Sequence, residues 1–185
     1  MANKSDTDFM RSLAVALVQQ PRATLQELAT LVGVSKATLY RFCRTRDELL
    51  ARLMSHCLHI HRRILVESDI NQAPVEQVLS HMINAHVAEK EFTTFLAAYW
   101  LTLENPEHPE TSEWNECMDT IDGFFLRGQR DGVFRLDTPA VVLSDMFLAT
   151  LGSLIEAERR GRVARMGLAE TIERLFLSGS KEQSA

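Results

Sequence analysis

The chain has 185 residues, enough for one domain, or for one domain and a small second unit, at roughly 150 residues per domain. Hydrophobic residues make up 45% of it and charged residues 24%, which excludes an intrinsically disordered or a collagen-like chain. No segment approaches the roughly 18 consecutive apolar residues of a membrane-spanning helix, so we expect a protein without a membrane span.

The net charge of -5 hides an uneven distribution along the chain. Residues 1–66 contain ten Lys and Arg against five Asp and Glu, a net charge of +5, whereas residues 67–185 contain ten against twenty, a net charge of -10. A basic N-terminal unit on an acidic body is typical of proteins that bind nucleic acid. Chance clustering of solvated surface charges is the alternative.

Cellular location and redox state follow from two further features. Residues 1–20 include Asp6, Asp8 and one short apolar run without a small-residue cleavage pattern, so we expect no secretory signal and a cytosolic protein. The cysteines are odd in number and widely spaced, which argues against a disulfide framework and against paired zinc-binding motifs. We expect reduced thiols at Cys43, Cys57 and Cys117.

The first dense group of structural signals begins at Thr24, in the segment TLQELATLVGVSKATLYRFC. Thr24 and Glu27 have the spacing of a capping box, which starts a short helix. Gly33 then supplies a turn, and Ser35 caps a second short helix over residues 36–42, with Leu39 as its inward anchor. Helix, glycine turn and helix together make a helix-turn-helix unit.

The second helix of such a unit lies in the major groove of DNA, while the first crosses the sugar-phosphate backbone. Lys36 and Arg41 can reach phosphates or guanine, Thr38 a base edge, and the Tyr40 hydroxyl a phosphate. Helix starts attract phosphate through their free backbone N–H groups. The candidate DNA-binding residues are therefore Thr24, Ser35, Lys36, Ala37, Thr38, Tyr40, Arg41 and Arg46.

A long helix follows. Thr45 and Glu48 have capping-box spacing and open this helix, which continues to about residue 66. It contains HCLHIH at residues 56–61, a pattern that raises the question of a metal site. Because Cys57 lies about 100 degrees round the helix from His56 and no nearby carboxylate or second cysteine completes a tetrahedral set, we expect no metal. We expect Cys57 to pack inward and the histidines to edge the interface between the domains.

The rest of the chain also has helical periodicity. Apolar residues recur at helical spacing over residues 75–87, 92–103 and 114–125, Asn105-Pro106 and His108-Pro109 interrupt the series, and Asp131-Gly132 closes it with a turn. No segment alternates with a period of two. We therefore predict an all-α fold, with a three-helix DNA-binding domain over residues 1–50 and a second helical domain over residues 51–185.

Methionine, histidine and aromatic side chains gather on three of these helices. They are candidates to line a pocket for an apolar or amphipathic organic molecule, although ordinary core packing is the alternative for each of them. The candidate pocket residues are Met82, His86, Phe95, Tyr99, Trp100, Trp114, Met118, Ile121 and Phe125.

The helix predicted after Thr138 and Pro139, over residues up to 158, is apolar on nearly all sides. Such a helix has to be covered on two sides, either by a second protomer or entirely within its own chain. Together with an apolar stripe over residues 168–177, it predicts a homodimeric four-helix contact. The candidate interface residues are Val142, Met146, Phe147, Ala149, Thr150, Ser153, Leu154, Ile172, Leu175 and Phe176.

The stretch ELATLVGVSKATLYRFCRTRDELL resembles the signature of the tetracycline-repressor (TetR) family of bacterial transcription regulators. The run from Leu13 to Val18 is similar to the first helix of that family, and residues 128–161 are similar to the stretch leading into its dimerisation helices. One departure is Cys43, where the family has an aromatic residue; we expect Phe42 to fill that space.

The resemblance implies that residues 51–185 form a ligand-binding and dimerisation domain. It also implies a repressor that binds a palindromic operator as a homodimer and is released when a small molecule enters this domain. No catalytic motif or pairing of acids is present, so we expect neither an enzyme nor a cofactor. The alternative is a helical ligand-binding or partner-binding protein that does not regulate through DNA.

Overall fold

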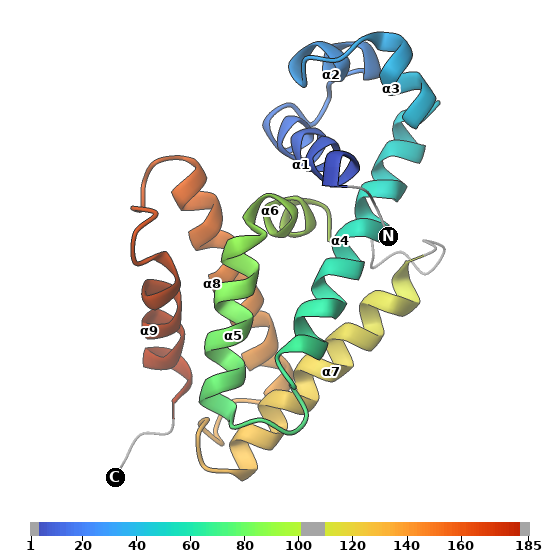
Figure 1. Cartoon of the computed structure of the whole chain (residues 1–185). Coiled ribbons are helices and arrows are strands. Elements are labelled where there is room, and N and C mark those ends of the chain that lie inside the picture. The colour runs from blue at the N-terminus through green and yellow to red at the C-terminus, as the bar shows by residue number, and fades with distance from the viewer. Residues whose placement is uncertain (1–3, 101–109, 182–185) are drawn as a thin grey trace.

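The computed structural model describes residues 4–100 and 110–181, and within these ranges it contains nine helices and no strand (Figure 1). The all-α prediction is confirmed. The helices are α1 (Lys4–Gln19), α2 (Leu25–Leu31), α3 (Lys36–Phe42), α4 (Arg46–Glu67), α5 (Val75–Ala88), α6 (Lys90–Tyr99), α7 (Thr111–Arg130), α8 (Ala140–Arg159) and α9 (Leu168–Ser180).

Helices α1 to α3 form a small head at one end of the molecule, and α4 runs from this head into a larger body built from α5 to α9 (Figure 1). The core of the head consists of leucines that are almost completely buried, from α1, α2, α3 and the start of α4: Leu13, Leu17, Leu28, Leu39 and Leu49. Burial of each such side chain contributes about 1.5–3 kcal/mol to folding. Helix α1 also packs against α6, so the head rests directly on the body.

The predicted caps are confirmed at α2 and at α3, where Ser35 is the N-cap, and the predicted capping box is only half formed at α4. Glu27 N donates to Thr24 Oγ1 at 3.3 Å and Thr24 N donates to a Glu27 carboxylate oxygen at 2.7 Å, which completes the predicted capping box. At α4 the Thr45 hydroxyl accepts from Glu48 N at 3.1 Å, but the Glu48 carboxylate accepts from Arg44 N instead. Helix α8 begins after Pro139 without a side-chain cap.

Glycines form the turns predicted after α2 and α7. Gly33 and Gly132 adopt φ values of +74° and +72° at the ends of α2 and α7, as turns at these positions require. The predicted interruption at Asn105-Pro106 and His108-Pro109 lies outside the described residues, and so does the last turn of the helix predicted over residues 92–103.

Five phenylalanines from α7, α8, α9 and the α7–α8 connection pack against one another in the core of the body. Their ring centroids lie 5.0 to 6.3 Å apart in the contacts between them, and all five are buried. They are Phe124, Phe125, Phe134, Phe147 and Phe176. The Phe134 ring packs directly on the backbone at Gly128. A Cβ at this position would come within 2.5 Å of the ring, so only glycine leaves enough space.

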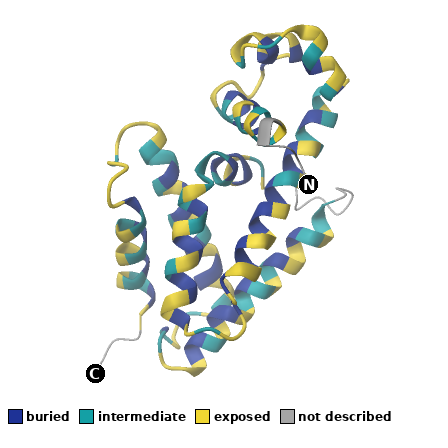
Figure 2. Ribbon diagram, viewed as in Figure 1, coloured by how far each residue is buried: buried dark blue, intermediate teal, exposed yellow. Residues whose placement is uncertain are grey.

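Helix α8 has length and composition that would suit a membrane span, a property shared with core helices of soluble proteins. Only 33% of its apolar window is buried inside the protomer, so much of this apolar helix remains uncovered (Figure 2). At Gly152 it lies close to α6, since a Cβ would meet the Ala97 Cβ at 3.1 Å. The close neighbour of α8 at Gly152 is therefore a helix of the same chain.

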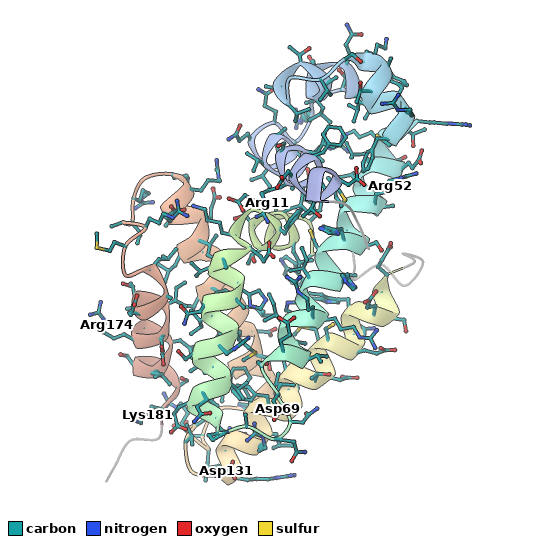
Figure 3. All side chains as sticks on the ribbon, in the orientation of Figure 1. Arg11, Arg52, Asp69, Asp131, Arg174 and Lys181 are labelled. Atoms are coloured by element: carbon teal, nitrogen blue, oxygen red, sulfur yellow. The ribbon has the colours of Figure 1, made fainter. Side chains whose placement is uncertain are left out.

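An ion-pair network joins the head to the body near Arg11, labelled in Figure 3. Arg11 of α1 donates to Glu89 at 2.8 Å and to Glu91 at 2.5 Å, at the junction of α5 and α6. Arg63 of α4 donates to the other oxygen of Glu89 at 3.0 Å, and the Arg11 guanidinium lies 4.9 Å from the centre of the Phe92 ring. The network fixes α1 relative to α4 and α6.

Candidate nucleic-acid interface and candidate ligand cavity

Helix α3 is held on the head by a narrow apolar side. Leu39 is fully buried, and Phe42 packs edge-on against Phe9 of α1 at 5.3 Å between ring centroids, in line with the role expected for it. Thr38 N donates to the Ser35 hydroxyl at 3.1 Å, which starts the helix. The remaining surface of this seven-residue helix faces solvent.

The predicted DNA-binding side chains gather around this exposed surface. Most of them are exposed, and Thr38 and Arg46 are half-buried. The Lys36 ammonium lies 5.3 Å from the centre of the Tyr40 ring, one turn along the helix. Arg46 differs from the others because it donates to the Pro21 carbonyl at 2.5 Å, so it also fixes the connection between α1 and α2. The exposed members of the set are Thr24, Ser35, Lys36, Ala37, Tyr40 and Arg41.

Two acidic side chains of the helices that flank α3, Glu27 of α2 and Glu48 of α4, accept hydrogen bonds from backbone N–H groups at the starts of those helices. The backbone N–H and then the hydroxyl of Thr24 hold the pKa of Glu27 below its ordinary value. The backbone N–H of Arg44, followed by Arg52, does the same for Glu48. Arg41 and Arg44 have no ion-pair partner among the described residues. The surface around α3 therefore keeps positive charge that can meet a phosphate backbone.

A cavity of about 1010 Å³ opens in the body, a size typical of sites for small organic molecules. Its wall combines α1, α4, α5, α6, α7 and α8 and is mostly apolar. Each of these helices contributes at least one lining residue, among them Val18, His61, His86, Thr93, Trp114 and Asp145. Val18 belongs to the head, so the cavity lies directly under α1.

The pocket prediction is partly wrong. The cavity wall includes His86, Trp100, Trp114 and Met118, but not the other five predicted residues. Met82 and Ile121 are fully buried in the core, Phe95 stacks on Tyr99 with ring centroids 4.7 Å apart, and Phe125 belongs to the phenylalanine cluster. Ordinary core packing, the alternative weighed from the sequence, explains these five.

Sequence reasoning missed His61, Val18 and the α8 wall of the cavity. His61 was read only as part of a possible metal motif, and nothing in its own helix distinguishes it. The sequence does indicate a role for α8, because a helix that is apolar on nearly all sides needs an apolar neighbour or a cavity on each side. One of those sides faces the cavity, through residues that include Leu148, Ala149, Leu151 and Ser153.

His61 and His86 form a buried pair in the cavity wall. His61 Nδ1 and His86 Nε2 are 2.9 Å apart, and His86 Nδ1 is 2.7 Å from the Met82 carbonyl oxygen. Burial, reinforced by the neighbouring histidine, lowers the pKa of His61 to about 3. Burial also lowers the pKa of His86 to about 4. Both rings are therefore neutral near pH 7.

The side chains of the HCLHIH segment lie in different surroundings. His56 packs edge-on against Phe92 with ring centroids 4.8 Å apart, His59 is exposed, and Cys57 points into the core as expected. No cluster of three or more His, Cys, Asp or Glu suited to a metal occurs in the part of the chain that the structure describes. Burial raises the pKa of the Cys43, Cys57 and Cys117 thiols, so none of them is an activated thiolate.

The predicted dimer surface also needs correction. Phe147, Ile172 and Phe176 lie in the protomer core with at most 2% of their surface exposed, so they cannot contact a second copy directly. The other predicted residues are exposed or half-buried on α8 and α9, and Ala149 and Ser153 line the cavity as well. Those residues are Val142, Met146, Ala149, Thr150, Ser153, Leu154 and Leu175.

No protein-family model matches the chain. The chain is 40% identical over 175 residues to the HTH-type transcriptional regulator NfxB of Pseudomonas aeruginosa, across 95% of this chain and 94% of NfxB. Its structure is similar to that of the ketosteroid transcriptional regulator KstR2 of Mycobacterium tuberculosis, with a TM-score of 0.78 at 12% identity over 99% of this chain and 98% of that chain. It is also similar to the TetR-like transcriptional regulator LfrR from Mycobacterium smegmatis, in complex with proflavine, with a TM-score of 0.72 at 19% identity over 95% of each chain.

Proposed function

Since the chain belongs to the TetR family of helix-turn-helix transcriptional regulators, whose members are not enzymes, we propose that it is a ligand-released repressor. In this proposal a homodimer in the cytosol places one α3 helix in each of two successive major grooves of a palindromic operator. The single observation that carries the proposal is the exposed, cationic surface of α3 at one end of the molecule, with Glu27 and Glu48 of the flanking helices engaged at helix starts.

The roles on DNA follow from the positions of the side chains. Lys36, Ala37 and Thr38 occupy the first turn of α3 and face the base edges, whereas Arg41 contacts a phosphate. The caps at Thr24 and Ser35 orient their helix N-termini toward the backbone phosphates. Arg46 acts mainly by holding the turn at Pro21, so its loss weakens binding indirectly.

Exposed apolar side chains on α8 and α9 support the homodimer. Val141, Val142 and Met146 form an uncovered apolar strip on α8, and Leu175 of α9 is 51% exposed. A second copy related by a two-fold axis would cover this strip with the same strip of its own, as in other isologous helix contacts.

The position of the cavity supports coupling between a ligand and the head. Val18 of α1 and Thr93 and Thr94 of α6 share its wall, and Arg11 ties the same two helices together through Glu89 and Glu91. A ligand that binds better when α1 and α6 are displaced shifts the spacing of the two α3 helices and lowers operator affinity. Such couplings amount to about 1–3 kcal/mol. Proflavine, the compound bound to the similarly folded LfrR, is a flat aromatic molecule, and we propose an effector of that general shape.

Selection of bound fragments from a random DNA pool, followed by gel shifts on the selected sequence, tests the DNA-binding proposal. The Lys36→Ala/Arg41→Ala variant should lose affinity by at least about tenfold, because each base contact contributes about 1–3 kcal/mol and each phosphate contact adds a salt-dependent term. The matched control is Arg162→Ala/Arg174→Ala, which removes the same charge from exposed positions on the body. Equal losses in the two variants would reject α3 as the reading helix.

Light scattering during size-exclusion chromatography tests the dimer. We expect a mass near twice the 21.0 kDa of one chain at micromolar concentration, and a shift toward the monomer on Met146→Glu. A monomeric wild-type protein would contradict the two-half-site arrangement.

A further inference from the structure

The histidine pair in the cavity wall has a fixed hydrogen-bond direction. The Met82 carbonyl can only accept, so His86 Nδ1 carries the proton that lies between them at 2.7 Å. Neutral His86 then has an unprotonated Nε2, which accepts from His61 Nδ1–H at 2.9 Å. The only remaining nitrogen of the pair, His61 Nε2, is therefore unprotonated and can only accept a hydrogen bond.

That nitrogen has no hydrogen-bond partner among the described residues, and it exposes less than 1 Å². His61 is 3% exposed and lines the cavity beside Trp114, whose ring lies 6.0 Å from the imidazole between centroids. A buried acceptor without a partner destabilises its surroundings, and a donor that reaches it recovers that energy. Because the atom is covered in this structure, a donor group of a ligand reaches it only when a neighbouring side chain moves aside.

The charged side chains in the cavity wall also disfavour an anionic ligand. Glu156 is paired with Arg159, the two atoms being 2.6 Å apart, whereas Asp145 has no ion-pair partner among the described residues. The pair of neutral histidines offers no N–H to an anion. A carboxylate in the cavity would therefore meet an acceptor at His61 and a like charge at Asp145.

We propose that this cavity selects a neutral or cationic aromatic effector that donates a hydroxyl or N–H hydrogen bond to His61 Nε2. The inference rests on the proposed ligand-binding function and specifies the ligand chemistry of that site. His86 is a positioning residue, since it orients His61 and does not itself present an unpaired nitrogen to the ligand.

Three naphthalenes that differ only in the substituent at position 2 test the proposal in equilibrium dialysis with the full-length protein. They are 2-naphthol, which can donate a hydrogen bond, 2-methoxynaphthalene, which cannot, and the anion 2-naphthoate. His61→Phe keeps an aromatic ring at this position and removes the acceptor, so it supplies the baseline for differences in probe hydrophobicity. Relative to that baseline, we expect wild-type protein to favour 2-naphthol over 2-methoxynaphthalene by about fivefold, the size of a net hydrogen bond, and to bind 2-naphthoate least.

The outcomes separate this inference from the function on which it rests. Binding of all three probes with the same ratios in wild-type and His61→Phe protein would overturn the inference and leave a ligand-binding cavity. No binding of any probe up to its solubility limit would contradict the ligand-binding function itself.

A measurement on wild-type protein alone covers the case in which His61→Phe does not fold. Nitrogen-15 NMR of the imidazoles should find the Nδ1–H tautomer in both rings, with the His61 Nε2 signal moving on addition of 2-naphthol and not of 2-methoxynaphthalene. An Nε2–H tautomer at His61 would overturn the proposal.

Discussion

Removal of the Arg11–Glu91 ion pair tests whether this pair stabilises the junction between the head and the body. The two side chains are 31% and 25% exposed and their charged atoms are 2.5 Å apart. Burial lowers the pKa of the Arg11 guanidinium, but hydrogen bonds to Glu89 and Glu91 outweigh it and hold that pKa above its ordinary value. Since solvent screens pairs at this exposure, we expect a coupling free energy of about 0.5–1 kcal/mol between the two residues.

The assay is a double-mutant cycle of Arg11→Met and Glu91→Gln, read by urea unfolding at one fixed protomer concentration. Arg11→Met alone should cost about 1–2 kcal/mol, because it also removes the bond to Glu89 and the contact with the Phe92 ring. The coupling should shrink in 0.5 M salt. A coupling below about 0.2 kcal/mol, or one that salt does not change, would refute the assignment of this pair as a stabilising link.

Three further predictions concern stability. Thr24→Ala should cost about 1 kcal/mol through loss of the helix cap, while Thr24→Ser should cost much less, and equal losses in urea unfolding would contradict the capping role. Gly128→Ala should cost about 1–3 kcal/mol by overpacking because its Cβ would lie 2.4 Å from a phenylalanine ring carbon, whereas Gly123→Ala, with no atom within 4 Å, should stabilise. Because burial holds the pKa values of His61 and His86 far below 6.5, the free energy of unfolding should fall as the pH drops from about 6.5 toward 4, by up to about 1.4 kcal/mol per pH unit for each ring. A double His61→Phe/His86→Leu variant should flatten this pH dependence, and an unchanged slope would show that other groups cause it.

The local part of the fold was predictable from the sequence because its determinants are local. Thr24, Gly33 and Ser35 act on the backbone within three or four residues, so their spacing fixes α2, the turn and α3 without reference to the rest of the chain. The exposure of Lys36 and Arg41 follows from the same pattern, since Leu39 sets which side of α3 faces inward.

The cavity and the dimer surface depend on which side of each helix meets which neighbour, and periodicity does not encode that choice. Phe125, Phe147 and Phe176 looked like pocket or interface residues because they are large and apolar, but they converge on one another from three helices. His61 shares a wall with His86 although 25 residues separate them in the sequence. Only the tertiary packing of α4 on α5 brings these two rings together.

Site-specific photocrosslinking to the selected operator tests the central claim most directly. A benzophenone amino acid at Ala37, exposed on the first turn of α3, should crosslink to bases in two half-sites about one helical turn apart. The same group at Asp131, at the far end of the body (Figure 3), should not crosslink. Crosslinks from Asp131 and none from Ala37 would contradict the account, because the surface around α3 would then not be the one that meets DNA.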